Sequence, residues 1–182
     1  MITVQNRALK QLLWVGMGSI SMFFAGLTSA YIVRKGEGNW VEFVLPDWFW
    51  YSTITIILSS VILILAQQNI KKDKSIFSLV LGVLVLGLLF TFFQFNGWNE
   101  LTSKGIYLTG KGSNVAGSFL YILTLAHLVH LIGGVIALLV TAINAKRKKY
   151  SSENYLGLEI ASIYWHFLSI LWVYLFCFLT YL

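Results

Sequence analysis

The sequence predicts an all-α integral membrane protein that crosses the bilayer with five helices. Of its 182 residues, 58% are hydrophobic and only 11% are charged, which is typical of a membrane protein with several spans. The apolar residues gather in five stretches, each near the ~20 residues that a helix needs to cross the hydrocarbon core. The expected spans cover about residues 12–33, 48–66, 75–95, 117–143 and 158–181. We expect a single transmembrane domain over residues 1–182.

The first expected span follows a short polar start that carries Arg7 and Lys10. Its run from Leu12 to Val33 contains no charged residue. A basic start before an apolar run is also typical of a cleaved signal peptide, but the apolar region of such a peptide usually has about 7–15 residues. This run is longer, so we interpret it as a retained helix, with cleavage as the alternative.

The second and third expected spans are marked by their boundaries. Residues 48–66 begin with Trp-Phe-Trp-Tyr, and such aromatic residues favour the membrane interface. A short basic connector then leads into residues 75–95, which end at Gln94 and the polar patch 96–100. The glycine-rich segment that follows, up to Ala116, is expected to lie on the surface.

The fourth and fifth expected spans enclose a basic cluster, Lys146 to Lys149. Connectors on the side of the amino terminus hold nine lysines and arginines, and connectors on the other side hold four. By the positive-inside rule the chain starts in the cytoplasm and ends outside, and we expect it in a bacterial inner membrane. The net charge of +6 is therefore interpreted as an orientation signal, and no nucleic-acid partner is expected.

Polar residues recur along the fifth span in a pattern that fits one face of a helix. Glu159, Ser162, His166 and Ser169 are three, four and three residues apart, so they fall along one stripe. An ionisable group in hydrocarbon costs at least ~2.5 kcal/mol. We therefore expect Glu159 and His166 to face protein, water or a lipid headgroup, with Glu159 at the cytoplasmic mouth of the span.

Three histidines raise the question of a metal or haem site. His127 and His130 share the fourth span, and a rise of ~1.5 Å per residue lets His130 and His166 approach in depth. The set has no second carboxylate at this depth, and the single cysteine, Cys177, lies within the last apolar run, so the ligand set is poor. We favour histidines that hydrogen-bond between helices or to a headgroup, with no metal in this chain.

Small residues follow the second of these histidines. Gly133, Gly134 and Ala137 mark a face on which another helix or a lipid could approach closely, and we expect Gly133, Gly134 and Trp165 to serve helix packing. The sequence shows no nucleotide-binding loop, no nucleophile with a paired base and no carboxylate pair. No catalytic residue is therefore expected.

Two motifs in the last two spans carry a family resemblance. The fifth span contains Glu159, then Tyr164, Trp165, His166, Phe167 and Trp172, and the fourth contains Gly117, Ser118, Phe119, His127, His130 and Gly134. Looser matches are Met22 to Leu27, Ser29 to Tyr31, Gln94 and Trp98. With these motifs in this order, the chain resembles subunit III of the haem–copper terminal oxidases, the cytochrome c oxidase family.

The resemblance implies the short five-helix bacterial form of a helical bundle without a redox centre, since haems and copper reside in subunits I and II of that family. It implies a subunit that packs against subunit I, binds phospholipid in a cleft and supports proton uptake and stability during oxygen reduction. Subunit II, membrane lipids and a larger respiratory supercomplex are further expected partners. Glu159, His127, His130 and His166 would form the polar lining that binds lipid.

Two positions depart from the family pattern. The family usually has a carboxylate just before Met-Phe-Phe, where Ile20 stands between Ser19 and Ser21. Ser169 stands where an aspartate often follows Tyr-Trp-His-Phe. A proton-uptake role that depends on these carboxylates would be absent here.

Two other functions stay open at this point. The chain could be subunit III of a quinol oxidase or an accessory protein of a nitric-oxide reductase, because nothing in its sequence indicates which electron donor the complex uses. A haem-binding membrane electron-transfer subunit that uses His130 and His166 is the less favoured alternative.

Overall fold

The computed structural model describes residues 2–38, 40–41, 43–110, 113–152 and 154–182, with side chains from Asn6 onward. Within these residues the chain forms five α-helices and no strand. They are α1 (Ile2–Gly36), α2 (Trp48–Ile70), α3 (Phe77–Ser103), α4 (Val115–Lys146) and α5 (Leu156–Tyr181). All five are long and apolar enough to cross a membrane, so the prediction of an all-α protein with five such helices is confirmed.

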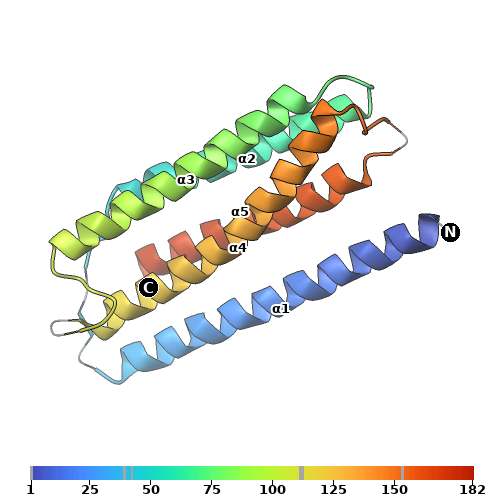
Figure 1. The fold of residues 1–182 in the computed structure, drawn as a ribbon. Coiled ribbons are helices and arrows are strands. Elements are labelled where there is room, and N and C mark those ends of the chain that lie inside the picture. Colours follow the sequence, from blue (N-terminus) through green and yellow to red (C-terminus); the bar gives the residue numbers. More distant parts are fainter. Residues whose placement is uncertain (1, 39, 42, 111–112, 153) are drawn as a thin grey trace.

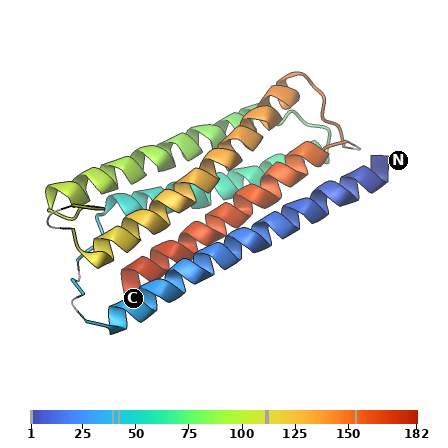
Figure 2. The same cartoon turned by 60° about the horizontal axis from the view of Figure 1, so that its bottom comes forward.

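Helices α2 to α5 form a four-helix bundle, and α1 lies against one side of it (Figure 1). Within the bundle, α2 and α4 each contact both α3 and α5. Among the described residues, α1 contacts α4 and α5 but neither α2 nor α3, and Figure 2 shows it running alongside α5. Helix α5 therefore has α1 on one flank and α2 on the other.

The helices extend past the apolar stretches that predicted them. Helix α1 begins at Ile2 rather than near residue 12, and α3 continues to Ser103 instead of ending at the polar patch. Helix α3 continues through this polar turn because polar side chains there bond to other helices. Trp98 Nε1 donates to Thr124 Oγ1 at 3.1 Å, so this polar turn is part of the packed bundle.

Two tryptophans of α5 form the centre of the bundle. Trp165 and Trp172 are fully buried, and their indole N–H groups donate to Ser59 and Thr53 of α2, each at 2.9 Å. Each of these hydroxyls donates in turn to a backbone carbonyl of α2. Large apolar rings are thus buried with their polar atoms satisfied, as a membrane interior requires.

Glycines on two helices make room for Trp165. A Cβ added at Gly87 of α3 would lie 2.8 Å from Cη2 of Trp165. One added at Gly134 of α4 would lie 2.9 Å from Cδ1 of Leu168 and 3.1 Å from Cε3 of Trp165. These distances are shorter than ordinary contacts, so the indole fits only because both side chains are absent.

The two ends of the bundle differ in charge. The amino terminus lies at the same end as the α2–α3 and α4–α5 connectors, and the carboxyl terminus lies at the opposite end (Figure 1). The basic residues of 71–74 and 146–149 are therefore at the end of the amino terminus. This placement fits the predicted orientation, which stays a prediction.

Candidate functional site

Glu159 lies in the first turn of α5, at the end that holds the amino terminus. Its Oε1 accepts a hydrogen bond from Nζ of Lys10 in α1 at 2.7 Å, and both side chains remain about one-third exposed, at 33% and 36%. With Asn6 and Asn154 they line a cavity of about 200 Å³. The ion pair joins α1 to α5 at a polar mouth, where Glu159 can stay hydrated.

His166 lies deeper along α5 and faces α2. A hydrogen bond joins its Nδ1 to the hydroxyl of Ser60. Its Nε2 is buried with no partner among the described residues, and the same is true of Oγ of Ser162, one turn closer to Glu159. Buried polar atoms of this kind mark a place where a water or a polar ligand group would be stabilised.

Two apolar grooves follow on the two flanks of α5. The groove between α2 and α5 has about 490 Å³ and includes Ile57 and Val61. The groove between α1 and α5 has about 360 Å³ and includes Ala25. Ile170 and Tyr174 line both grooves, so these two side chains form the ridge between them. Open apolar grooves at a membrane-facing surface have the chemistry that hydrocarbon chains require.

His127 belongs to the bundle core and not to this groove surface. It is completely buried, and its Nε2 donates to the carbonyl oxygen of Leu168 at 3.0 Å. Its ring lies 5.1 Å from the ring of Trp172 and 5.7 Å from that of Phe90. The predicted bond between helices is present, because His127 ties α4 to the backbone of α5.

His130 faces a different neighbour. Its Nδ1 donates to the carbonyl of Ala126 in its own helix at 2.7 Å, and its ring centroid lies 5.7 Å from that of Phe24 in α1. Tyr164 of α5 donates to the His130 carbonyl at 3.2 Å. His130 thus faces α1 while His166 faces α2, and the structure does not bring the two imidazoles together.

The described residues contain no group of three or more His, Cys, Asp or Glu that could hold a metal ion. The rise per residue lets His130 and His166 approach in depth, but they could share a gap only if both imidazoles also pointed toward it. The His130 ring packs on Phe24 of α1, whereas His166 bonds to Ser60 of α2. The geometry therefore gives no support to a haem held between them.

The three expected packing residues play unequal parts. Trp165 and Gly134 meet at the bundle centre, as described above. Gly133 is exposed, and a Cβ added there would lie 3.6 Å from the Tyr164 hydroxyl, an ordinary contact. Gly134 is therefore the glycine whose missing side chain the packing requires.

The two positions that depart from the family pattern are filled by contacts of another kind. Ile20 of α1 packs against the apolar core. Ser169 is buried, and its hydroxyl donates to the carbonyl of Trp165 at 2.9 Å within α5. Neither position offers an ionisable group to the groove surface.

Sequence reasoning missed Lys10 and Ser60 as partners of the polar stripe. Lys10 was expected at the same membrane end as Glu159, which was the available signal, but nothing in the sequence said that α1 would pack beside α5. Ser60 is one of several hydroxyl residues in α2. Its pairing with His166 follows from the rotation of α2 about its axis, which hydropathy does not define.

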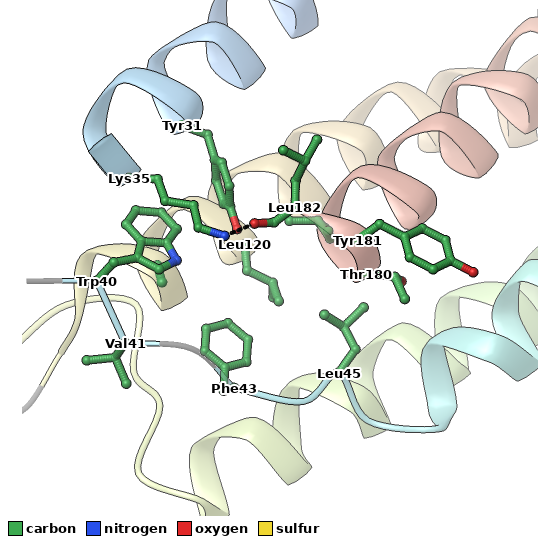
Figure 3. Close-up of a pocket in the computed structure, with 12 residues that line it drawn as sticks. Tyr31, Lys35, Trp40, Val41, Phe43, Leu45, Leu120, Thr180, Tyr181 and Leu182 are labelled. Atoms are coloured by element: carbon green, nitrogen blue, oxygen red, sulfur yellow. Dashed lines mark hydrogen bonds between the residues drawn. The ribbon is translucent and has the colours of Figure 1, made fainter. Parts of the chain in front are cut away.

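A further cavity of about 200 Å³ lies at the opposite end of the bundle (Figure 3). It is lined by aromatic residues, including Tyr31, Trp40 and Phe43, and by Lys35, whose Nζ donates to the carbonyl oxygen of Leu182. The rings of Tyr31 and Trp40 meet edge to face, with centroids 4.7 Å apart. The bond from Lys35 to Leu182 joins α1 to the end of α5 a second time, at a surface whose aromatic residues are typical of a membrane interface.

Comparison with known proteins agrees with this architecture. The family model for cytochrome c oxidase subunit III matches residues 47–182, which contain α2 to α5. The chain is 28% identical over 173 residues to cytochrome c oxidase subunit 3 of Thermostichus vulcanus, an alignment that covers 87% of this chain and 79% of the relative. It is 29% identical over 175 residues to the probable cytochrome c oxidase subunit 3 of Nocardia farcinica, covering 89% and 82%.

These similarities cover most of the chain and come from bacterial relatives of similar extent. The five apolar helices agree with them, since such helices are those of a multi-pass membrane protein. The chain therefore belongs to the cytochrome c oxidase subunit III family.

Proposed function

We propose that this chain is an accessory subunit of a respiratory haem–copper oxidase that holds a phospholipid along α5 and packs against subunit I. The family places it in an oxidase complex, and that family lacks redox centres of its own. Oxygen reduction would then take place in partner subunits. The role of this chain would be to keep lipid and partner in place during turnover.

The observation that carries the proposal is the order in which polar and apolar features follow one another along α5. The polar mouth at Glu159 and Lys10 comes first, His166 and Ser162 follow, and the two grooves beside Ile170 come last. Glu159 and Ile170 are ~16 Å apart along the helix at ~1.5 Å per residue. A phospholipid has the same order of parts, with a charged head followed by two acyl chains that could lie on the two flanks of Ile170.

The mouth favours a headgroup that carries both signs of charge. Lys10 can approach a phosphate, and Glu159 can approach an ammonium group, without burying an unpaired charge. The unpartnered Nε2 of His166 and Oγ of Ser162 lie between this mouth and the grooves. They are polar groups of α5 at the depth where the glycerol and ester groups of a lipid would lie, and both atoms are buried.

We infer that any support of proton uptake is indirect. Glu159 is the one acidic residue in α1 and α5, and it is paired with Lys10. Ile20 and Ser169 offer no carboxylate in the middle of these helices. A stable lipid-filled interface with subunit I, rather than a proton path through this chain, is the contribution that the residues support.

The test is to fill the grooves in the intact oxidase. Ile170→Trp places an indole on the ridge shared by both grooves, and Ile132→Trp is the matched control on α4, where Ile132 is 54% exposed and lines neither groove. We expect Ile170→Trp to lower the tightly bound phosphorus per haem and to speed inactivation during turnover, with the initial rate near that of the wild type. Equal phospholipid content in the two variants would refute the proposal.

The alternative function is that of a quinol oxidase subunit, and the two functions differ in the electron donor of the complex. A quinol-oxidising complex would use the same bundle, grooves and ion pair, so those features do not separate the two. The relatives named above are cytochrome c oxidase subunits, which favours cytochrome c as the electron donor. Whether the co-purified subunit II contains a copper site is the measurement that decides.

A further inference from the structure

The end of the bundle that holds the amino terminus contains a cavity that the lipid grooves do not use. It lies between the α2–α3 and α4–α5 connectors and has about 300 Å³. Its floor is apolar, because Ile70 and Ile76 line it and are only 4% and 3% exposed, with Ala145 beside them. We propose that this cavity binds the phosphate of an anionic phospholipid headgroup.

The rim of the cavity carries two lysines from different connectors. Lys74 and Lys148 both line it and both are exposed. Neither forms an ion pair with any residue that the structure describes. Tyr150 also lines the cavity. Two ammonium groups without an ion-pair partner, beside an apolar floor, are the groups that the phosphate of a lipid headgroup requires.

The surroundings strengthen the positive field. Residues 70–76 and 145–150 contain seven basic side chains and one acidic side chain, Asp73. Oδ1 of Asp73 accepts a hydrogen bond from the Ser152 backbone N–H at 2.8 Å, so this carboxylate ties the two connectors together. Clusters of four to eight lysines and arginines next to a membrane helix attract anionic lipids.

The cavity is held by similar turns at the ends of α2 and α4. Asp73 and Lys148 have φ of 52° and 53°, and the N–H groups of Lys74 and Lys149 each bond to a carbonyl in the preceding helix at 3.0 Å. The carboxyl ends of these two helices carry partial negative charge, so an anion here depends on the lysines. The start of α3, which has no side-chain cap, adds unpaired N–H groups beside the cavity.

Other cavities have a different charge pattern. Among the described residues that line the mouth of α5, the one cation is Lys10, which is already paired with Glu159. At the opposite end, Lys35 donates to Leu182 (Figure 3). The cavity between the connectors is the one of these three whose lysines have no recorded partner, and it therefore suits a ligand with net negative charge. This inference needs only the membrane-spanning fold, and it does not depend on the lipid grooves beside α5.

The test compares two double variants with the same loss of charge. Lys74→Ser with Lys148→Ser removes the lysines of the rim, and Lys71→Ser with Lys149→Ser removes neighbours that do not line the cavity. The full chain, in neutral detergent, is titrated with dioleoyl phosphatidylglycerol and with dioleoyl phosphatidylcholine, and bound lipid is counted by native mass spectrometry. Far-ultraviolet circular dichroism checks that each variant is folded.

We expect the wild type to prefer the anionic lipid and the rim variant to lose about tenfold of that preference, while the control variant stays within about twofold. Asp73→Asn keeps an oxygen for Ser152 and removes the negative charge, so it should raise the affinity for phosphatidylglycerol. An equal loss in both double variants would overturn the proposal in favour of diffuse surface charge. Displacement of the lipid by inorganic phosphate would overturn it in favour of a free-phosphate site.

Discussion

The α2–α5 bundle and helix α1 are held in different ways, although both are apolar enough to cross a membrane. In the most apolar stretch of α1, 17% of the residues are buried, against 33–50% in the other four helices. The bundle buries Trp165 and Trp172 completely, whereas Trp14 of α1 is 62% exposed. Direct polar bonds to α1 come from Glu159, Tyr174 and Leu182 of the α5 segment.

The α2–α5 bundle is held by its own buried core, whereas α1 depends on its contacts with α4 and α5. The family match begins at residue 47 and covers the bundle. Helix α1 forms one wall of a groove and one side of the polar mouth. We therefore expect core substitutions to cost stability, and substitutions along the α1–α5 seam to cost retention of lipid and partner.

The largest expected effect comes from Trp165→Ala. Removing a fully buried indole leaves a cavity and an unsatisfied Ser59 hydroxyl acceptor, so the free energy of unfolding should fall by about 3–5 kcal/mol. Trp14→Ala is the control from α1, because its indole is largely exposed, and it should change stability by less than about 0.5 kcal/mol. Unfolding in mixed detergent micelles measures both. Similar losses would show that α1 is as tightly packed as the bundle.

A smaller effect is expected at two adjacent glycines. Gly134→Ala forces a methyl group against Leu168 and Trp165 and should cost about 1–3 kcal/mol through overpacking. Gly133→Ala meets only an ordinary contact, and it should be neutral or slightly stabilising because alanine favours a helix. The midpoints of thermal unfolding compare them. If Gly133→Ala destabilised as much, the close contact at Gly134 would not be the cause.

The smallest stability effects are expected at the polar stripe of α5, where Glu159 contacts α1 and His166 contacts α2. Glu159→Ala removes a partly exposed ion pair worth roughly 0.2–1 kcal/mol, and His166→Leu removes the bond to Ser60. Both should reduce retention of the chain in the detergent-washed oxidase more than they reduce initial turnover. Glu100→Ala is the control, since its pair with Lys104 lies within one end of α3. Unchanged retention with collapsed initial turnover would contradict a supporting role.

Much of the fold could be predicted from the sequence because hydrocarbon imposes length and apolarity on every span. The ends of the helices were harder to predict. The polar turn after residue 95 looks like a loop by composition, yet Trp98 bonds to Thr124 and Gly97 packs on Phe49. Composition detects polarity, but only the folded bundle shows whether a polar group has a partner in another helix.

The sequence predicted which residues form the polar stripe of α5, but it did not predict which helix each of them contacts. The spacing of Glu159 and His166 placed them on one stripe, and helical periodicity suffices for that. It does not say which neighbour each part of the stripe meets. Glu159 turned out to face Lys10 of α1, and His166 faces Ser60 of α2. Rotation of each helix is set by its neighbours, which a hydropathy pattern does not contain.

The indole bonds to Ser59 and Thr53 also bear on how the chain assembles. Apolar side chains tolerate sliding of one helix along another, but a hydrogen bond to a single hydroxyl does not. The two bonds lie about two helical turns apart on α5, so a shift by one residue would break both in a medium without water to replace them. Helix α5 can reach its final register only after α2 is in the membrane, which is the order in which the chain is synthesised.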